Sequence, residues 1–118
     1  MADSGLFIGW GEIVRGRETE AVEHFNATID YFSGLQADGT IESFEPVFLE
    51  PHGGDLGGFF FIRGDADKLA ALRVDDDFDA VIQKATLIAD KMGVVGAVMG
   101  ARLEQQVNSY VGAIAQFA

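Results

Sequence analysis

Cysteine is absent from this chain of 118 residues, which excludes disulfides, thiolate nucleophiles and thiolate metal sites. Histidine is scarce as well. His24 and His52 make up the whole supply, and neither lies in the spacing of a metal-ligand motif. We therefore expect no metal site. The lack of cysteine also fits a cytoplasmic protein.

Basic residues are few, because eight lysines and arginines stand against 19 acids and leave a net charge of −11. A field of that sign repels nucleic-acid phosphates and anionic lipid, so neither nucleic acid nor a membrane is an expected partner. No apolar run approaches the roughly 20 residues of a membrane helix. The first ten residues carry no base, unlike a secretory signal. We expect a cytoplasmic protein formed by one domain, residues 1–118.

Apolar residues make up 48% of the chain, and their spacing alternates between that of strands and that of helices. Strands are predicted where β-branched and aromatic residues gather, at residues 6–14, 40–50, 58–63 and 94–103. Helices are predicted by a 3.6-residue period, at residues 18–37, after Asp65, at residues 78–92 and over residues 107–117. The order βαββαβ with an extra C-terminal helix predicts an α+β, ferredoxin-like plait. Its second strand lies at a sheet edge, where Pro46 is tolerated.

Glycine is abundant, with 15 residues, and it clusters at two places. The loop in EPHGGDLGGFFFIRGD, residues 50–65, could bind an anion through its amides. A phosphate cradle normally opens a helix, however, whereas a strand follows here, so a hairpin turn is favoured. His52 could still contact a ligand at its rim. The cluster around Gly9 and Gly11 fails as a dinucleotide fingerprint because Val14 takes the place of its third glycine, and we expect no cofactor.

The predicted strands are apolar on both faces. Phe59 and Phe61 point to one side of the third strand, and Phe60 and Ile62 point to the other. A plait with helices on one face leaves the other face in water, so a second copy laid face to face predicts a homodimer. Alternatively, the C-terminal helix, which is uncharged from Gln105 onward, could cover that face within one chain. The same helix could also build a higher oligomer.

This arrangement resembles the dimeric α/β-barrel superfamily of small ferredoxin-like proteins, which includes antibiotic-biosynthesis-type monooxygenases, muconolactone isomerases and YciI-like proteins. The segments LQADGTI, FFFIRGD and DDDF, with the glycine hairpin between the first two, look most like the YciI-like branch or its bacterial relatives. The resemblance implies two sheets packed face to face, and it allows a cofactor-independent isomerase or monooxygenase. The branch's pattern includes a helix-borne histidine with a nearby acid, and His24 is the helical candidate in this chain.

A candidate site can form between the first helix and the sheet. His24, Thr28 and Tyr31 share one flank of that helix, and Trp10 and Glu12 are assigned to one face of the first strand. These side chains could line a ligand pocket whose catalytic proton would move through His24 or Glu12.

Arg63 on the third strand completes this constellation. It could hold an anionic or carbonyl group of a ligand, together with the binding residues Trp10, Tyr31 and His52. The competing interpretation is a structural pair between Glu12 and Arg63, because an unpaired charge within an apolar strand is costly, or strand ends at which both charges simply reach water. Three functions remain open: binding of a small, partly apolar or aromatic molecule, a cofactor-independent enzyme, and a purely structural or interaction module.

Overall fold

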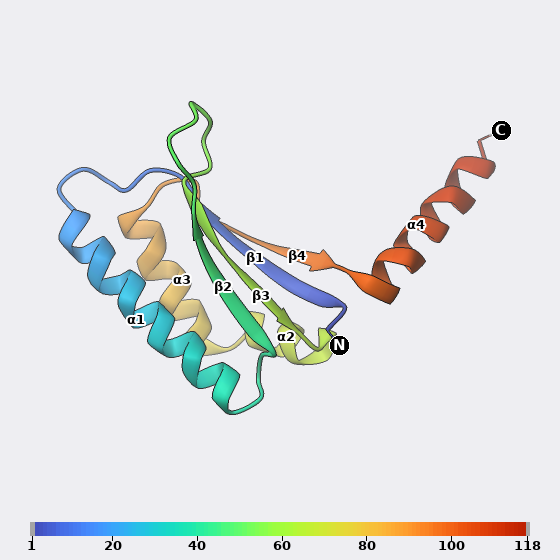
Figure 1. The fold of residues 1–118 in the computed structure, drawn as a ribbon, viewed down its shortest axis with the longest axis horizontal. Helices are drawn as coiled ribbons and strands as arrows, with labels where there is room; N and C mark the ends of the chain where they lie inside the picture. Colours follow the sequence, from blue (N-terminus) through green and yellow to red (C-terminus); the bar gives the residue numbers. More distant parts are fainter. Residues whose placement is uncertain (1, 118) are drawn as a thin grey trace.

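The computed structural model describes residues 2–117 and contains one four-stranded sheet with helices (Figure 1). The elements in chain order are β1 (Ser4–Trp10), α1 (Glu18–Ala37), β2 (Ser43–Phe48), β3 (Gly58–Gly64), α2 (Ala66–Arg73), α3 (Asp76–Ile88), β4 (Gly93–Val98) and α4 (Gly100–Ala115). The strand order is β2-β3-β1-β4, and every neighbouring pair is antiparallel. This is the predicted ferredoxin-like plait, with Pro46 on the edge strand β2.

Local sequence explains where two of the helices begin. The carboxylate of Asp65 accepts hydrogen bonds from the backbone N–H groups of Asp67 and Lys68, both at 3.1 Å, and caps α2. Asp75 caps α3 in the same way through the N–H groups of Asp77 and Phe78. Each cap satisfies backbone donors that a helix leaves free at its first turn.

The core lies between one face of the sheet and the helices α1, α2 and α3. Alternate residues of β1 and β3 point into it, since Leu6 pairs with Ile62 and Ile8 pairs with Phe60. The buried core side chains are Leu6, Ile8, Phe32, Ile41, Phe60, Ile62, Leu69, Leu72 and Phe78. All three of these helices therefore lie on one side of the sheet, and the other side is the open face.

The open face carries the second set of alternating residues. Phe7 pairs with Phe61 across β1 and β3, and with Val95 across β1 and β4. The rings of Phe7 and Phe59 stack with their centroids 4.8 Å apart. The guanidinium of Arg63 lies 4.9 Å from the centre of the Phe61 ring. The face is thus largely apolar, as expected, and helices α1, α2 and α3 leave it uncovered.

Three strands are shorter than predicted, and one of them is β2, which spans Ser43–Phe48 rather than residues 40–50. β1 ends at Trp10 because the chain then turns away, and Ile13 makes only an isolated bridge with Ala89. The predicted fourth strand at residues 94–103 was wrong in its second half, because β4 ends at Val98 and α4 begins at Gly100. Gly100 has a φ of +55°, in the left-handed region that breaks an extended strand and favours glycine.

Helix α4 leaves the body of the molecule beyond β4 (Figure 1). None of its residues is buried. The radius of gyration is 16.4 Å, whereas a compact chain of this length has about 13.5 Å. The alternative in which the C-terminal helix covers the open face of its own sheet is therefore not the arrangement found.

Candidate functional site

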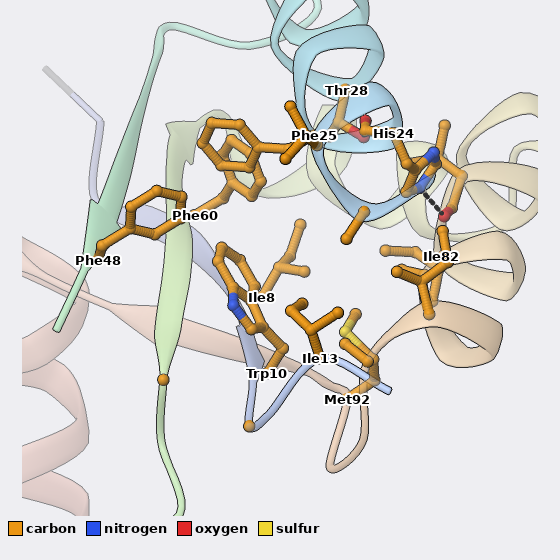
Figure 2. Close-up of a pocket in the computed structure, with 18 of the residues that line it drawn as sticks. Ile8, Trp10, Ile13, His24, Phe25, Thr28, Phe48, Phe60, Ile82 and Met92 are labelled. Atoms are coloured by element: carbon orange, nitrogen blue, oxygen red, sulfur yellow. Dashed lines mark hydrogen bonds between the residues drawn. The ribbon is translucent and has the colours of Figure 1, made fainter. Parts of the chain in front are cut away.

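A cavity of about 630 Å³ lies between α1, α3 and the core side of the sheet (Figure 2). Its volume falls within the range of small-molecule pockets. Lining residues such as Val22 and Phe48 are exposed, so the cavity is open to solvent. Most of its lining is apolar and comes from β1, α1, β3, α3 and the segments that flank the strands. The main apolar lining residues are Ile8, Trp10, Ile13, Val22, Phe25, Phe48, Leu49, Phe60, Val81, Ile82, Ala85, Ile88 and Met92.

One stripe of α3 lines this space. α3 contacts α1 and α2, and its Phe78 lies in the core beneath the sheet. The stripe consists of Val81, Ile82, Ala85 and Ile88. Apolar atoms beside an empty space lack partners on that side and forgo dispersion contacts. A ligand that fills the space would restore them.

Aromatic rings form one wall. The centroids of Trp10 and Phe60 are 5.6 Å apart, and Phe25 lies 5.3 Å from Phe60 and 4.9 Å from Phe48. Figure 2 shows this group on one side of the cavity, with Ile82 and Met92 on the other. Phe48 and Leu49 are exposed, so the wall continues to the surface. Such a wall offers faces and edges on which an aromatic ligand can pack.

Polar side chains at the cavity are few, and two of them already have partners. The Nε2–H of His24 donates to the carbonyl oxygen of Val81 over 2.9 Å and so ties α1 to α3 (Figure 2). The hydroxyl of Thr28 donates to the carbonyl oxygen of His24 over 2.7 Å. An imidazole that donates through Nε2 can accept a hydrogen bond through Nδ1. Besides His24 and Thr28, the indole N–H of Trp10 and the carboxylate of Glu18 are the polar side-chain groups of the lining.

The charged side chain in the cavity lining is acidic. Among the lining residues that the structure describes there is no lysine or arginine, and Glu18 is the one carboxylate. Glu18 is exposed, and its Oε1 accepts a hydrogen bond from the N–H of Gly16 over 2.9 Å. Together with a net charge of −11, this lining disfavours an anionic ligand.

Two of the predicted site residues, Trp10 and His24, line this cavity, and Thr28 lines it beside them. Tyr31, one turn further along α1, does not. Its ring packs 5.5 Å from that of Phe32, and its buried hydroxyl has no hydrogen-bond partner in the described part of the chain. Burial, with added repulsion from aspartates that include Asp75, raises the pKa of Tyr31 to about 12.

Arg63 and Glu12 do not lie where the candidate site needed them. Arg63 pairs with Gly5 and is on the open face, so the sheet separates it from the cavity. Its ion-pair partner is Glu45, at 3.8 Å, rather than Glu12. Glu12 lies beyond the end of β1, is exposed, and does not share a strand face with Trp10. The expected Glu12–Arg63 pair is therefore corrected to Glu45–Arg63.

His52 holds the loop between β2 and β3 together. Its Nε2–H donates to the carbonyl oxygen of Leu56 over 2.7 Å, while the N–H of Gly54 donates to its Nδ1 over 3.1 Å. Both ring nitrogens are thus used within the loop. Lys91 and Asp55 form an ion pair of 2.9 Å that ties the loop to the turn before β4. The glycine-rich stretch connects two strands, as the sequence predicted, and His52 lies outside the cavity lining.

The sequence-based candidate site missed the contribution of α3. The small side chain of Ala85, and that of Ala21 on α1, both line the cavity and leave room between the elements. Small residues on an apolar stripe were the available signal, but they do not reveal how far a helix stands from its sheet. Within residues 2–117, no group of three or more acidic or histidine side chains could hold a metal ion. Nor does any helix there have the length and apolar character needed to cross a membrane.

Comparison with known proteins adds one structural relative. A dimeric protein of unknown function and ferredoxin-like fold from Bacteroides fragilis superposes with a TM-score of 0.59 at 11% sequence identity. The match covers 81% of this chain and 96% of the other. The fold is ferredoxin-like. No family model matches the sequence, and no curated protein matches it.

Proposed function

We propose that this protein binds a small, uncharged and largely apolar molecule, with aromatic molecules favoured, in the cavity between α1, α3 and the sheet. The observation that carries the proposal is the cavity itself, about 630 Å³ of space with an apolar lining. Such a space leaves its apolar lining without the contacts and burial that stabilise a packed interior. A ligand would recover that energy.

The aromatic wall and the imidazole of His24 define the ligand class further. Trp10, Phe25 and Phe60 offer aromatic surfaces, and Nδ1 of His24 can accept a hydrogen bond from a hydroxyl or N–H group. An aromatic alcohol is the simplest molecule that meets both conditions. A carboxylate would meet no cation in the lining and would face the carboxylate of Glu18 at the rim.

The strength of binding can be estimated from buried area. An aromatic alcohol of two fused rings that buries about 300 Å² of apolar surface gains about 7 kcal/mol. Loss of translational and rotational freedom reduces the net value. With a loss of about 4 kcal/mol, about 3 kcal/mol remains, which corresponds to a dissociation constant of about 6 mM for such a probe.

We also infer that the protein forms a homodimer through the open face of its sheet, as in a dimeric α/β barrel. Support comes from the apolar face formed by Phe7, Phe59, Phe61 and Val95, and from the dimeric state of the Bacteroides fragilis protein. The chain also exposes 7749 Å², about 1,500 Å² more than a compact monomer of this mass. A standard interface takes about 800 Å² from each partner.

Intrinsic fluorescence tests the ligand proposal, because Trp10 is the chain's only tryptophan and lines the cavity. The protein is titrated with 1-naphthol, with naphthalene and with the anion 1-naphthoate. We expect a saturable change in Trp10 emission with 1-naphthol, a weaker one with naphthalene, and the weakest with 1-naphthoate. Absence of saturation with all three probes, or tightest binding of the anion, would refute the proposal.

A further inference from the structure

Helix α4 carries an apolar stripe that its own chain does not cover. Residues at spacings of three and four fall on one side of this 16-residue helix, and all of them are exposed. The members of the stripe are Leu103, Val107, Tyr110, Val111 and Ile114. Val107 is 51% exposed and Val111 is 58% exposed, so about half of each side chain has no partner.

The sequence of α4 gives it little stability of its own. A helix of about this length is marginal in water without tertiary contacts. Gly112 lies in its interior, where glycine costs about 1 kcal/mol relative to alanine. Met99 at its N-cap makes no side-chain hydrogen bond, the first turn has no acid and the last turn has no base. Formation of α4 therefore requires that its stripe be covered.

The open sheet face supplies only part of a dimer interface. Four strands of six or seven residues have a projected area of about 400 Å² on that face. This projected area is smaller than the roughly 800 Å² of accessible surface that each partner of a standard complex buries. The chain nevertheless exposes 7749 Å², an excess of about 1,500 Å² over a compact monomer. A second surface must account for the remainder.

Helix α4 has the dimensions to supply it. Its 16 residues form a cylinder about 24 Å long and about 10 Å wide, with a projected area of about 240 Å². In a twofold dimer each copy gives one such arm and receives the other, so with the sheet face the projected contact area of each copy is about 900 Å². The helix has no charge after Glu104, which lets two chains of −11 meet there without repulsion.

We propose that α4 is an arm that packs its apolar stripe onto a second copy of this chain, beside the open sheet face. The inference rests on the proposed homodimer and adds the surface that makes it stable. A membrane is the less favoured occupant, because interfacial helices carry several bases and α4 has only Arg102. In the dimer, the partner copy covers the apolar stripe of α4 and stabilises the helix. In a dissociated chain, the stripe is exposed to water.

The test compares two variants of the full chain. In the stripe variant, Val107→Asn and Val111→Asn remove two apolar contacts. In the matched control, Gln105→Asn and Ser109→Asn place the same residue type on the other side of α4. Light scattering over a dilution series gives the dimer dissociation constant, and Trp10 emission verifies that the body of the molecule is folded. We expect a dimer of about twice 12.7 kDa for the unmodified chain and the control, and at least 100-fold weaker association of the stripe variant.

Hydrogen exchange of the unmodified chain provides a second readout that needs no substitution. The amides of residues 103–114 should be protected in the dimer and exchange freely on dilution below the dissociation constant. The proposal that α4 is an arm would be refuted if the stripe variant dimerised as tightly as the unmodified chain, or if the α4 amides were unprotected within a stable dimer. Either result would leave the proposed dimer through the open sheet face unaffected. A monomer at 100 µM would overturn the arm and the homodimer together, while the ligand titration would still stand on its own.

Discussion

Filling the cavity from within should stabilise the protein and abolish ligand binding at the same time. Ala85 lies on the side of α3 that lines the cavity. The substitution Ala85→Leu adds three carbon atoms, each worth up to about 0.8 kcal/mol when buried. Because Ala85 is half-buried, we expect a gain of about 1–2 kcal/mol in the free energy of unfolding. Leucine is nearly as good a helix former as alanine, so the backbone adds little.

The matched control is Ala80→Leu, which makes the same change at an exposed position of α3 outside the cavity lining. Its effect on the free energy of unfolding should stay within about 0.5 kcal/mol. Urea unfolding measures both variants, and Trp10 titration with 1-naphthol should show at least tenfold weaker binding to Ala85→Leu alone. Destabilisation of Ala85→Leu by more than about 1 kcal/mol would refute the reasoning, because it would mean that the space is already filled.

Three further substitutions test other parts of the structure. Gly57→Ala should lower the free energy of unfolding by about 2 kcal/mol, because the new Cβ would meet the carbonyl oxygen of Gly11. Gly34→Ala, in open space on α1, should raise it by about 0.5–1 kcal/mol. Equal effects of the two substitutions in urea unfolding would contradict the close contact at Gly57. Tyr31→Phe should not destabilise the protein at pH 7, because the lost hydroxyl has no partner among the described residues. Since the pKa of Tyr31 rises from 10.0 to about 12 on folding, the unmodified protein should lose stability between pH 10 and 12, and Tyr31→Phe should lose less of it in thermal melts; identical pH profiles would be inconsistent with this. Arg63→Ala should leave 1-naphthol affinity unchanged, and a tenfold loss would place the ligand on the open face.

The sequence predicted the order of elements because the spacing of apolar residues changes clearly between strands and helices. It also placed Pro46 on an edge strand, where the missing N–H of proline removes no hydrogen bond between strands. The end of β4 could not be located in the same way. Val94 to Leu103 is apolar almost throughout, and only the backbone of Gly100 shows where the extended chain turns into α4.

The candidate site was predicted in part. Periodicity tells which residues of one strand share a face, but register decides which faces of two strands coincide. Trp10 pairs with Gly58 and therefore shares a side with Phe60, which leaves Arg63 on the other side. His24 was found because α1 is long and regular. The cavity depends on how α1, α3 and the strands pack around it, which no residue pattern encodes.

Calorimetric titration of the purified protein with 1-naphthol tests the central claim most directly. The account predicts one saturable site per chain, with a heat-capacity decrease that marks the burial of apolar surface, and loss of that site in Ala85→Leu. Heat that grows without saturation, or an unchanged site in Ala85→Leu, would contradict it.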